Sequence, residues 1–201
     1  DSRPISAPAC TSMSPRDPPT QTPANAAMTD GAGADHELGM QFTSTVAGQL
    51  TAVRFWKSAN ETSGSHVGKI WSSAGVLLAS VTFTGETASG WQQVTFSEPV
   101  EIIPGATYIA SYFAPHGNFA VTPNAFRDFR VTNKVGSLTA LRAADGGNGM
   151  FRLGGGFPKN YSSDNANYYV DVLFANAHNT TRMALTGVIS ATGCAAVGEP
   201  I

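Results

Sequence analysis

The residues of this chain best suited to ligand recognition are aromatic side chains set among amides, hydroxyls and basic groups. A flat ring can stack on the apolar face of a sugar, while polar neighbours hydrogen-bond the sugar hydroxyls. In the segment 49–57, Val53 and Phe55 alternate with Arg54 and Trp56. Alternate residues of a strand face opposite sides, so Trp56 points away from the core if Phe55 points into it. We expect Trp56 to be either a stacking platform or a side chain covered by the N-terminal segment.

Three further places combine rings with polar groups. Trp71 ends a predicted strand beside a turn, where it could contact a ligand or plug the edge of the core. The loop 115–119 suits either a binding loop or a hairpin turn. The glycine-rich segment 151–161 carries several rings, which need a ligand or a neighbouring surface to cover them. Trp91, after a glycine at a strand start, is interpreted as a packing residue. The predicted ligand-binding residues are Trp56, Trp71, His116, Asn118, Arg152, Phe157 and Tyr161.

Two carboxylates are candidate ligands for a structural calcium ion. Glu37 opens the first predicted strand of the sandwich, and Asp171 lies in the last. Calcium takes six to eight oxygen ligands, usually including two or three carboxylates. Because Asp171 alternates with Tyr169 and Leu173, it falls on a face that could be buried, where an unpaired carboxylate is costly. Either a cation or an arginine partner would satisfy it, and Arg54 is available for the second role.

Motifs typical of several enzyme classes are absent from the sequence. There is no G-x-S-x-G elbow, P-loop, dinucleotide fingerprint or H-E-x-x-H. The four histidines are scattered, and residue 1 is aspartate, so an N-terminal histidine brace for copper cannot form. No pair of acidic residues is marked as the acid and base of a glycosidase. We therefore expect a protein that is not an enzyme.

The charge balance and hydropathy of the chain argue against two kinds of partner. Only 13% of the 201 residues are charged and the formal net charge is −2, so no basic field for nucleic acid is expected. No apolar run reaches the roughly 18 residues that a membrane span needs. We expect binding to neither nucleic acid nor the membrane interior.

The elements that must position these residues read as short strands. Alternating apolar and polar residues recur every 8 to 15 residues with turn residues between them, and no segment keeps a 3.6-residue period. This pattern predicts an all-β, antiparallel, jelly-roll-like β-sandwich over residues 35–175. The predicted strands are 37–45, 49–57, 67–71, 76–84, 91–96, 107–114, 119–121 and 168–174.

The two ends of the chain differ from this body. Residues 1–34 hold six of the twelve prolines and no aromatic residue, which predicts an extended, irregular arm. Residues 176–201 form a polar tail whose apolar stretch, 183–189, could add an edge strand. The two cysteines, Cys10 and Cys194, lie one in each end and are expected to form a disulfide, with two buried thiols as the alternative. A disulfide predicts an oxidising compartment, and so a secreted or cell-surface protein.

Three N-x-S/T sequons occur, at Asn60, Asn160 and Asn179. They would carry glycans only in an organism that glycosylates its secreted proteins.

Seven strings within the strand-rich region occur together in a recognisable order. They are ELGMQF at 37–42, VRFWK at 53–57, GKIWS at 68–72, TASGWQQV at 87–94, YIASYFAPHG at 108–117, DGGNG at 145–149 and YYVDV at 168–172. In this order they resemble the bacterial secreted module named domain of unknown function 4082, over roughly residues 35 to 175.

This resemblance implies a β-sandwich with an accessory role beside carbohydrate-active, adhesion or laminin-like modules. It brings no catalytic residue with it. Together with the aromatic candidates, it leads us to expect a non-catalytic extracellular module that binds a glycan or glycoconjugate. The alternative is a structural or adhesive module that contacts neighbouring surface-protein domains.

Overall fold

The computed structural model describes residues 11–12, 23–30, 33–62, 64–128, 131–132 and 137–176. Within these ranges the protein is an antiparallel β-sandwich, as expected, with two single 3-10 turns at Pro115–Gly117 and Ala143–Asp145. No helix in the described part is long and apolar enough to cross a membrane. Cys10, Cys194, Asn179 and the stretch 183–189 lie outside the described residues, so the disulfide and the extra edge strand stay predictions.

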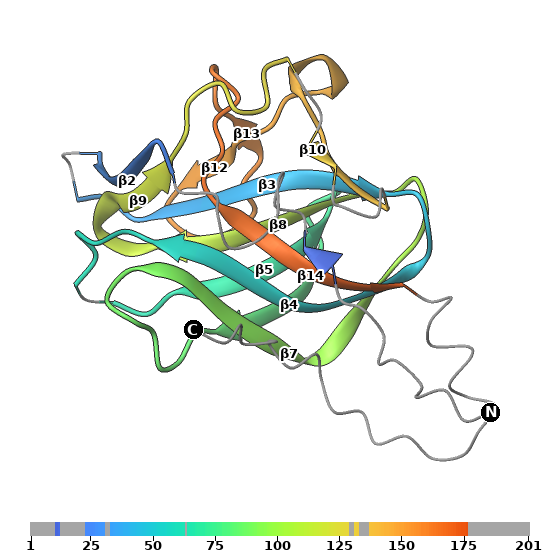
Figure 1. The fold of residues 1–201 in the computed structure, drawn as a ribbon, viewed down its shortest axis with the longest axis horizontal. Helices are drawn as coiled ribbons and strands as arrows, with labels where there is room; N and C mark the ends of the chain where they lie inside the picture. The colour runs from blue at the N-terminus through green and yellow to red at the C-terminus, as the bar shows by residue number, and fades with distance from the viewer. Residues whose placement is uncertain are drawn as a thin grey trace, which may run out of the picture.

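The smaller sheet has the strand order β1-β14-β4-β7, with all neighbours antiparallel (Figure 1). Its strands are β1 (Thr11–Ser12), β14 (Val170–Asn176), β4 (Gly48–Lys57) and β7 (Gly90–Ile102).

The larger sheet has the order β10-β11-β3-β8-β5-β6, and the β12–β13 hairpin joins it through β3. Its strands are β3 (His36–Ser44), β5 (Val67–Ser72), β6 (Leu77–Thr82), β8 (Thr107–Ala114), β10 (Val131–Thr132), β11 (Leu138–Ala140), β12 (Met150–Leu153) and β13 (Asn160–Tyr161). The chain crosses repeatedly between the two sheets, which gives the jelly-roll-like character.

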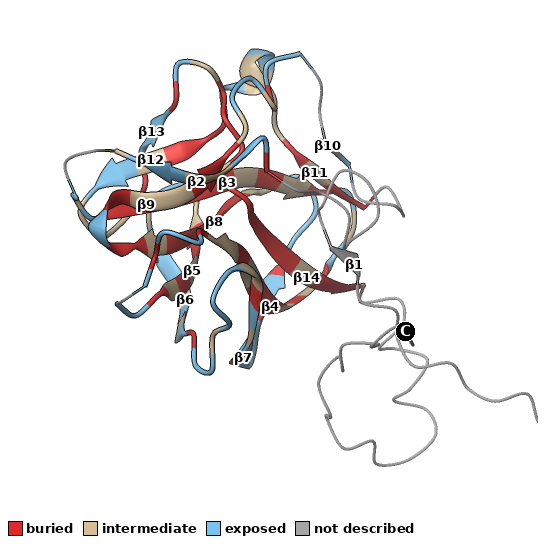
Figure 2. Ribbon diagram, turned by 60° about the vertical axis from the view of Figure 1, so that its left-hand side comes forward, coloured by how far each residue is buried: buried red, intermediate tan, exposed pale blue. Residues whose placement is uncertain are grey.

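The core lies between the sheets because one side of each strand is apolar. Leu38, Met40 and Phe42 of β3 face the other sheet, where Val53 and Phe55 of β4 are 0% and 1% exposed. Each such side chain contributes about 1.5–3 kcal/mol when fully buried. Figure 2 shows the buried positions concentrated along the strands of the two facing sheets. This alternation also settles which residues of β3, β4 and β14 point outward.

The sheets approach each other closely at Gly68. A Cβ atom at this position would lie 2.4 Å from Cγ1 of Val53 in the opposite sheet. Glycine is therefore required at this position by the contact between the sheets. The next residue, Lys69, faces the outer side of β5.

The prediction of a wholly irregular N-terminal arm is wrong at two places. Thr11–Ser12 form β1 against β14, and β2 (Asn25–Thr29) pairs with β9 (Asn118–Val121). The sequence of β2, NAAMT, shows no alternation of apolar and polar residues that would predict a strand. Its partner lies some 90 residues further along the chain, so no neighbouring turn signals the pairing either. The short segment Ala26–Met28 has small and apolar side chains that tolerate this pairing.

Candidate binding face

The outer side of the smaller sheet carries two rows of chemically distinct side chains. The strand register places Asp171, Arg54 and Gln93 side by side across β14, β4 and β7. Two residues along β4, Trp56 lies directly opposite Trp91 of β7. Residues i and i+2 of a strand share a face, so the polar row and the tryptophan pair lie on one surface.

The two tryptophans form a bent pair. Their ring centroids are 5.8 Å apart and their planes meet at 76°, and both side chains are partly exposed. Trp91 also lies 6.2 Å from the ring of Tyr169, which precedes β14. Because β4 separates β7 from β14, and adjacent strands are about 4.8 Å apart, the indole of Trp91 reaches across β4.

Tyr169 is fixed in place at the edge of this surface. Its backbone has a φ of +56°, a conformation uncommon for a non-glycine residue, and its carbonyl accepts a hydrogen bond from the backbone of Trp56 at 2.9 Å. Its hydroxyl is hydrogen-bonded to Thr122 Oγ1 at 2.8 Å. Burial raises the pKa of Tyr169, so it remains an uncharged phenol under ordinary conditions.

Arg54 joins the polar row to the rings. Its guanidinium carbon lies 4.7 Å from the centroid of Trp91, a cation–π arrangement. Its Nε and Nη2 donate to Oδ2 of Asp171 at 2.9 and 2.5 Å. The carboxylate of Asp171, whose side chain is 4% exposed, also accepts the backbone N–H of Val172 through Oδ1 at 2.8 Å. Of the two predicted partners for Asp171, the structure thus shows the arginine.

Glu37 lies on the opposite side of the sandwich. Its inward neighbour Leu38 belongs to the same core as Val170 and Val172, so the side chains of Glu37 and Asp171 point away from each other. Glu37 is fully buried, with Oε2 2.5 Å from Nζ of Lys69.

The proposed pairing of Glu37 with Asp171 as calcium ligands is therefore not assembled by this geometry. Among the residues that the structure describes, no group of three or more histidine, cysteine, aspartate or glutamate side chains is arranged to hold a metal.

Trp71 belongs to a buried chain of contacts around Glu37. Its indole N–H donates to Ser111 Oγ at 2.8 Å, and Ser111 Oγ donates to Glu37 Oε1 at 2.5 Å. The indole is 7% exposed and packs with Ile109, Met150 and Phe157. Trp71 is therefore a packing residue, but it lies on the outer side of the larger sheet and does not plug the edge of the core between the sheets.

The glycine-rich segment 151–161 covers this outer side of the larger sheet. Phe157 meets Trp71 with centroids 5.7 Å apart and planes at 60°, which means that a neighbouring surface covers this ring. Arg152 is exposed on β12, and Tyr161 is 56% exposed on β13. The hairpin thus keeps two of its predicted binding residues open to solvent.

The remaining predicted residues lie at the end of the sandwich where β3 begins and β8 ends. His116 sits in the turn between β8 and β9 with a φ of +59°, and its side chain is 54% exposed. Asn118, at the start of β9, pairs with Thr29 of β2 and is partly exposed. The seven predicted residues thus fall in three separate regions, with Trp56 alone on the smaller sheet.

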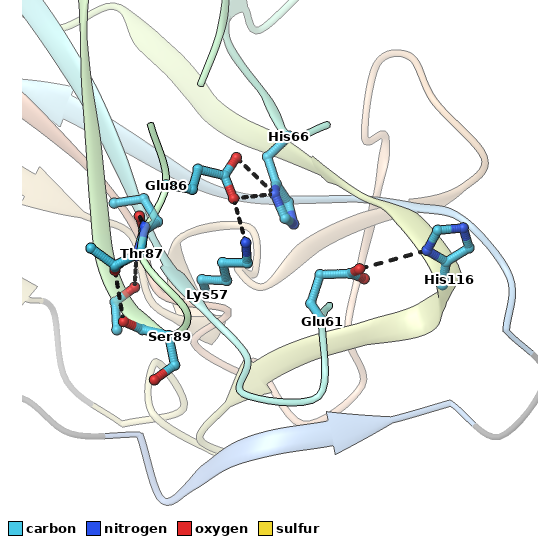
Figure 3. A network of polar contacts seen from close by, with 9 residues as sticks. Lys57, Glu61, His66, Glu86, Thr87, Ser89 and His116 are labelled. Atoms are coloured by element: carbon cyan, nitrogen blue, oxygen red, sulfur yellow. Dashed lines mark hydrogen bonds and ion pairs between the residues drawn. The ribbon is translucent and has the colours of Figure 1, made fainter. Parts of the chain in front are cut away.

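A polar network occupies the same end of the sandwich (Figure 3). Glu86 Oε2 lies 2.9 Å from both His66 Nδ1 and Lys57 Nζ, and Glu61 Oε1 lies 3.6 Å from His116 Nδ1. Burial lowers the pKa of His66, whose side chain is 1% exposed, although the carboxylate of Glu86 opposes the shift. Because His66 is sealed from solvent, it cannot touch a ligand and serves the packing of this end.

Both described sequon asparagines lie at the surface. Asn160 is exposed on β13, and Asn60 is exposed while its side-chain amide donates to the carbonyl of Ala27 at 3.0 Å. Their glycosylation stays a prediction.

Sequence reasoning missed Trp91 as the partner of Trp56. The string Gly90-Trp91-Gln92-Gln93 indicates a strand start, and the alternation places Trp91 and Gln93 on one side. That the two tryptophans face each other follows only from the register between β4 and β7. The available signal was that Trp56 lies near the end of one predicted strand and Trp91 at the start of another, which would bring the two rings together if the strands were antiparallel neighbours.

Comparison of the sequence with known proteins identifies a family for this chain. A search of curated proteins finds no match to the chain. The model of one protein family matches residues 20–170 and so includes β2, which the resemblance drawn from sequence strings had left outside. Since this match covers well over half of the chain, the protein belongs to the family described as Domain of unknown function (DUF4082).

Proposed function

We propose that this domain is a non-catalytic extracellular module that binds glycans through the outer face of its smaller sheet. The observation that carries the proposal is the partly exposed pair Trp56 and Trp91 beside a row of polar side chains. Rings offer apolar area to the C–H face of a sugar, and the exposed amide of Gln93 supplies a donor and an acceptor next to it. We call Trp56, Trp91, Arg54, Gln93 and Asp171 the tryptophan face.

The predicted affinity is low for a single domain. Three strands span about 10 Å across the sheet, so the tryptophan face can contact only a short length of glycan. Such modules gain affinity when several copies are linked and bind one polymer. An accessory position beside other surface modules is therefore part of the proposal.

The test is a glycan array followed by affinity gel electrophoresis on the polysaccharides that bind. Trp56→Ala should weaken retardation about tenfold or more, while melting temperature and far-ultraviolet circular dichroism show that the variant is folded. Tyr161→Ala is the matched control, because it removes an aromatic ring that is exposed on the opposite side of the sandwich. Absence of binding to any glycan would overturn the proposal.

A second candidate function is a structural or adhesive module, and β6 favours it. This strand is the edge of the larger sheet, and Val76, Leu77 and Leu78 at its start are 58%, 47% and 41% exposed. No charged residue or proline lies between residues 70 and 85, although natural edge strands usually carry such residues to prevent pairing. Light scattering over a range of concentrations tests this function. Self-association that Leu78→Lys removes would support it, and a monomer at all concentrations would count against it.

The extracellular location rests on the two cysteines and awaits a chemical test. Mass spectrometry of the unfolded, unreduced protein after alkylation should find neither Cys10 nor Cys194 modified. Alkylation of both thiols would remove the argument for an oxidising compartment.

A further inference from the structure

We infer that the tryptophan face takes single, uncharged glycan chains from solution and does not bind the flat surface of a crystalline polysaccharide. This inference rests on the proposed function and names the class of ligand for the same face.

The angle between the two indoles carries the first part of the inference. A flat crystalline surface can stack on two rings at once only if the rings share a plane. The planes of Trp56 and Trp91 meet at 76°, so a flat surface that stacks on one ring meets the edge of the other. A single chain can bend and turn, and one of its sugars can therefore stack on one ring while its neighbour contacts the other.

The surroundings of Trp91 hold this angle. The guanidinium of Arg54 lies 4.7 Å from the ring centroid, and Tyr169 lies 6.2 Å away on the far side of β4. Both neighbours are themselves anchored, Arg54 by two hydrogen bonds to Asp171 and Tyr169 by its hydrogen bond to Thr122. Turning Trp91 to flatten the pair would require its ring to leave these contacts, because packed side chains do not deform continuously.

The charge balance of the face carries the second part. The positive charge of Arg54 is neutralised by Asp171, whose side chain is almost fully buried. At the neighbouring end of β4, Lys57 is 2.9 Å from Glu86. Neither basic group is left over to attract a carboxylate or sulfate, whereas the exposed amide of Gln93 both donates and accepts hydrogen bonds. These groups suit the hydroxyls of a neutral glycan.

The experiment compares three kinds of polysaccharide with the whole protein. Affinity gels contain neutral soluble polymers (hydroxyethyl cellulose, galactomannan, xylan and soluble starch) or acidic ones (hyaluronan and polygalacturonate). Depletion assays use microcrystalline cellulose and α-chitin. We expect retardation by at least one neutral soluble polymer, weakened about tenfold or more by Trp56→Ala and unchanged by Tyr161→Ala, with no depletion by either crystalline solid.

Each other outcome refutes a defined statement. Depletion by a crystalline solid that Trp56→Ala removes would overturn the single-chain inference and leave the proposed function standing. Stronger retardation by an acidic polymer would overturn the assignment of an uncharged ligand. Binding that is lost in Tyr161→Ala and kept in Trp56→Ala would overturn the inference, since another face would then be the site. Absence of all binding would remove the proposed function and the inference together.

Discussion

Replacing Asp171 with asparagine should destabilise the domain strongly. The side chains of Asp171 and Arg54 are only 4% and 11% exposed, so the variant leaves a guanidinium in a largely buried place without its carboxylate. Removing one member of a buried ion pair costs about 3–5 kcal/mol, a large share of the roughly 5–15 kcal/mol that stabilises a typical domain. Asparagine keeps the size of the side chain, so the loss measures charge and hydrogen bonding rather than a cavity.

Urea unfolding, followed by tryptophan fluorescence and by circular dichroism, measures the effect. With an m-value of about 2 kcal/mol/M, a loss of 4 kcal/mol would move the midpoint by about 2 M. The control is the double variant Arg54→Leu with Asp171→Leu, which removes both charges and should be close to neutral or stabilising. A loss below about 1 kcal/mol for Asp171→Asn would place the pair among solvent-screened surface ion pairs and refute the argument that Asp171 fixes Arg54 over the ring of Trp91.

Three further predictions concern groups that the structure buries. Tyr112→Phe should raise the free energy of unfolding, by up to about 1–3 kcal/mol, because the buried hydroxyl of Tyr112 has no hydrogen-bond partner in the described part of the chain; a lower urea midpoint for the variant would contradict this. Burial lowers the pKa of His66 below 6.5 against the opposing pull of Glu86, so the unfolded chain takes up this proton first as the pH falls. The free energy of unfolding should therefore decrease as the pH falls below 6.5, and His66→Asn should reduce that decrease; an unchanged pH profile in the variant would assign the effect to other groups. Addition of EDTA should leave the melting temperature unchanged, because Glu37 and Asp171 are each paired with a basic side chain; a clear fall would give calcium a structural role.

The alternation of side chains predicted which face of its strand Trp56 occupies. Val53 and Phe55 are buried while Trp56 is partly exposed on the opposite side of β4, as the period of two requires. The same reasoning raised Arg54 as a partner for Asp171, and the register of β4 and β14 places these two residues opposite each other. Both inferences needed only the direction in which side chains point along a strand.

Contacts between distant segments could not be predicted in this way. The strands that carry Trp56 and Trp91 are separated by the whole β5–β6 hairpin, and alternation does not say which residues of two strands face each other. The course of a long loop is equally hidden, and Phe157 reaches Trp71 from such a loop. The pairing of Trp91 with Trp56 and the contact of Phe157 with Trp71 were consequently not predicted.

Trp56 and Trp71 show why an outward position does not by itself make a binding residue. Both point away from the core of the sandwich, and each is the next-to-last residue of its strand. The larger sheet pairs with the β12–β13 hairpin at β3, and the segment that follows β12 brings Phe157 over Trp71 and leaves it 7% exposed. On the smaller sheet Trp56 contacts Trp91 edge to face, and both rings keep part of their surface in solvent. The partly exposed tryptophan pair therefore lies on the smaller sheet, whereas Trp71 of the larger sheet packs against the segment that follows β12.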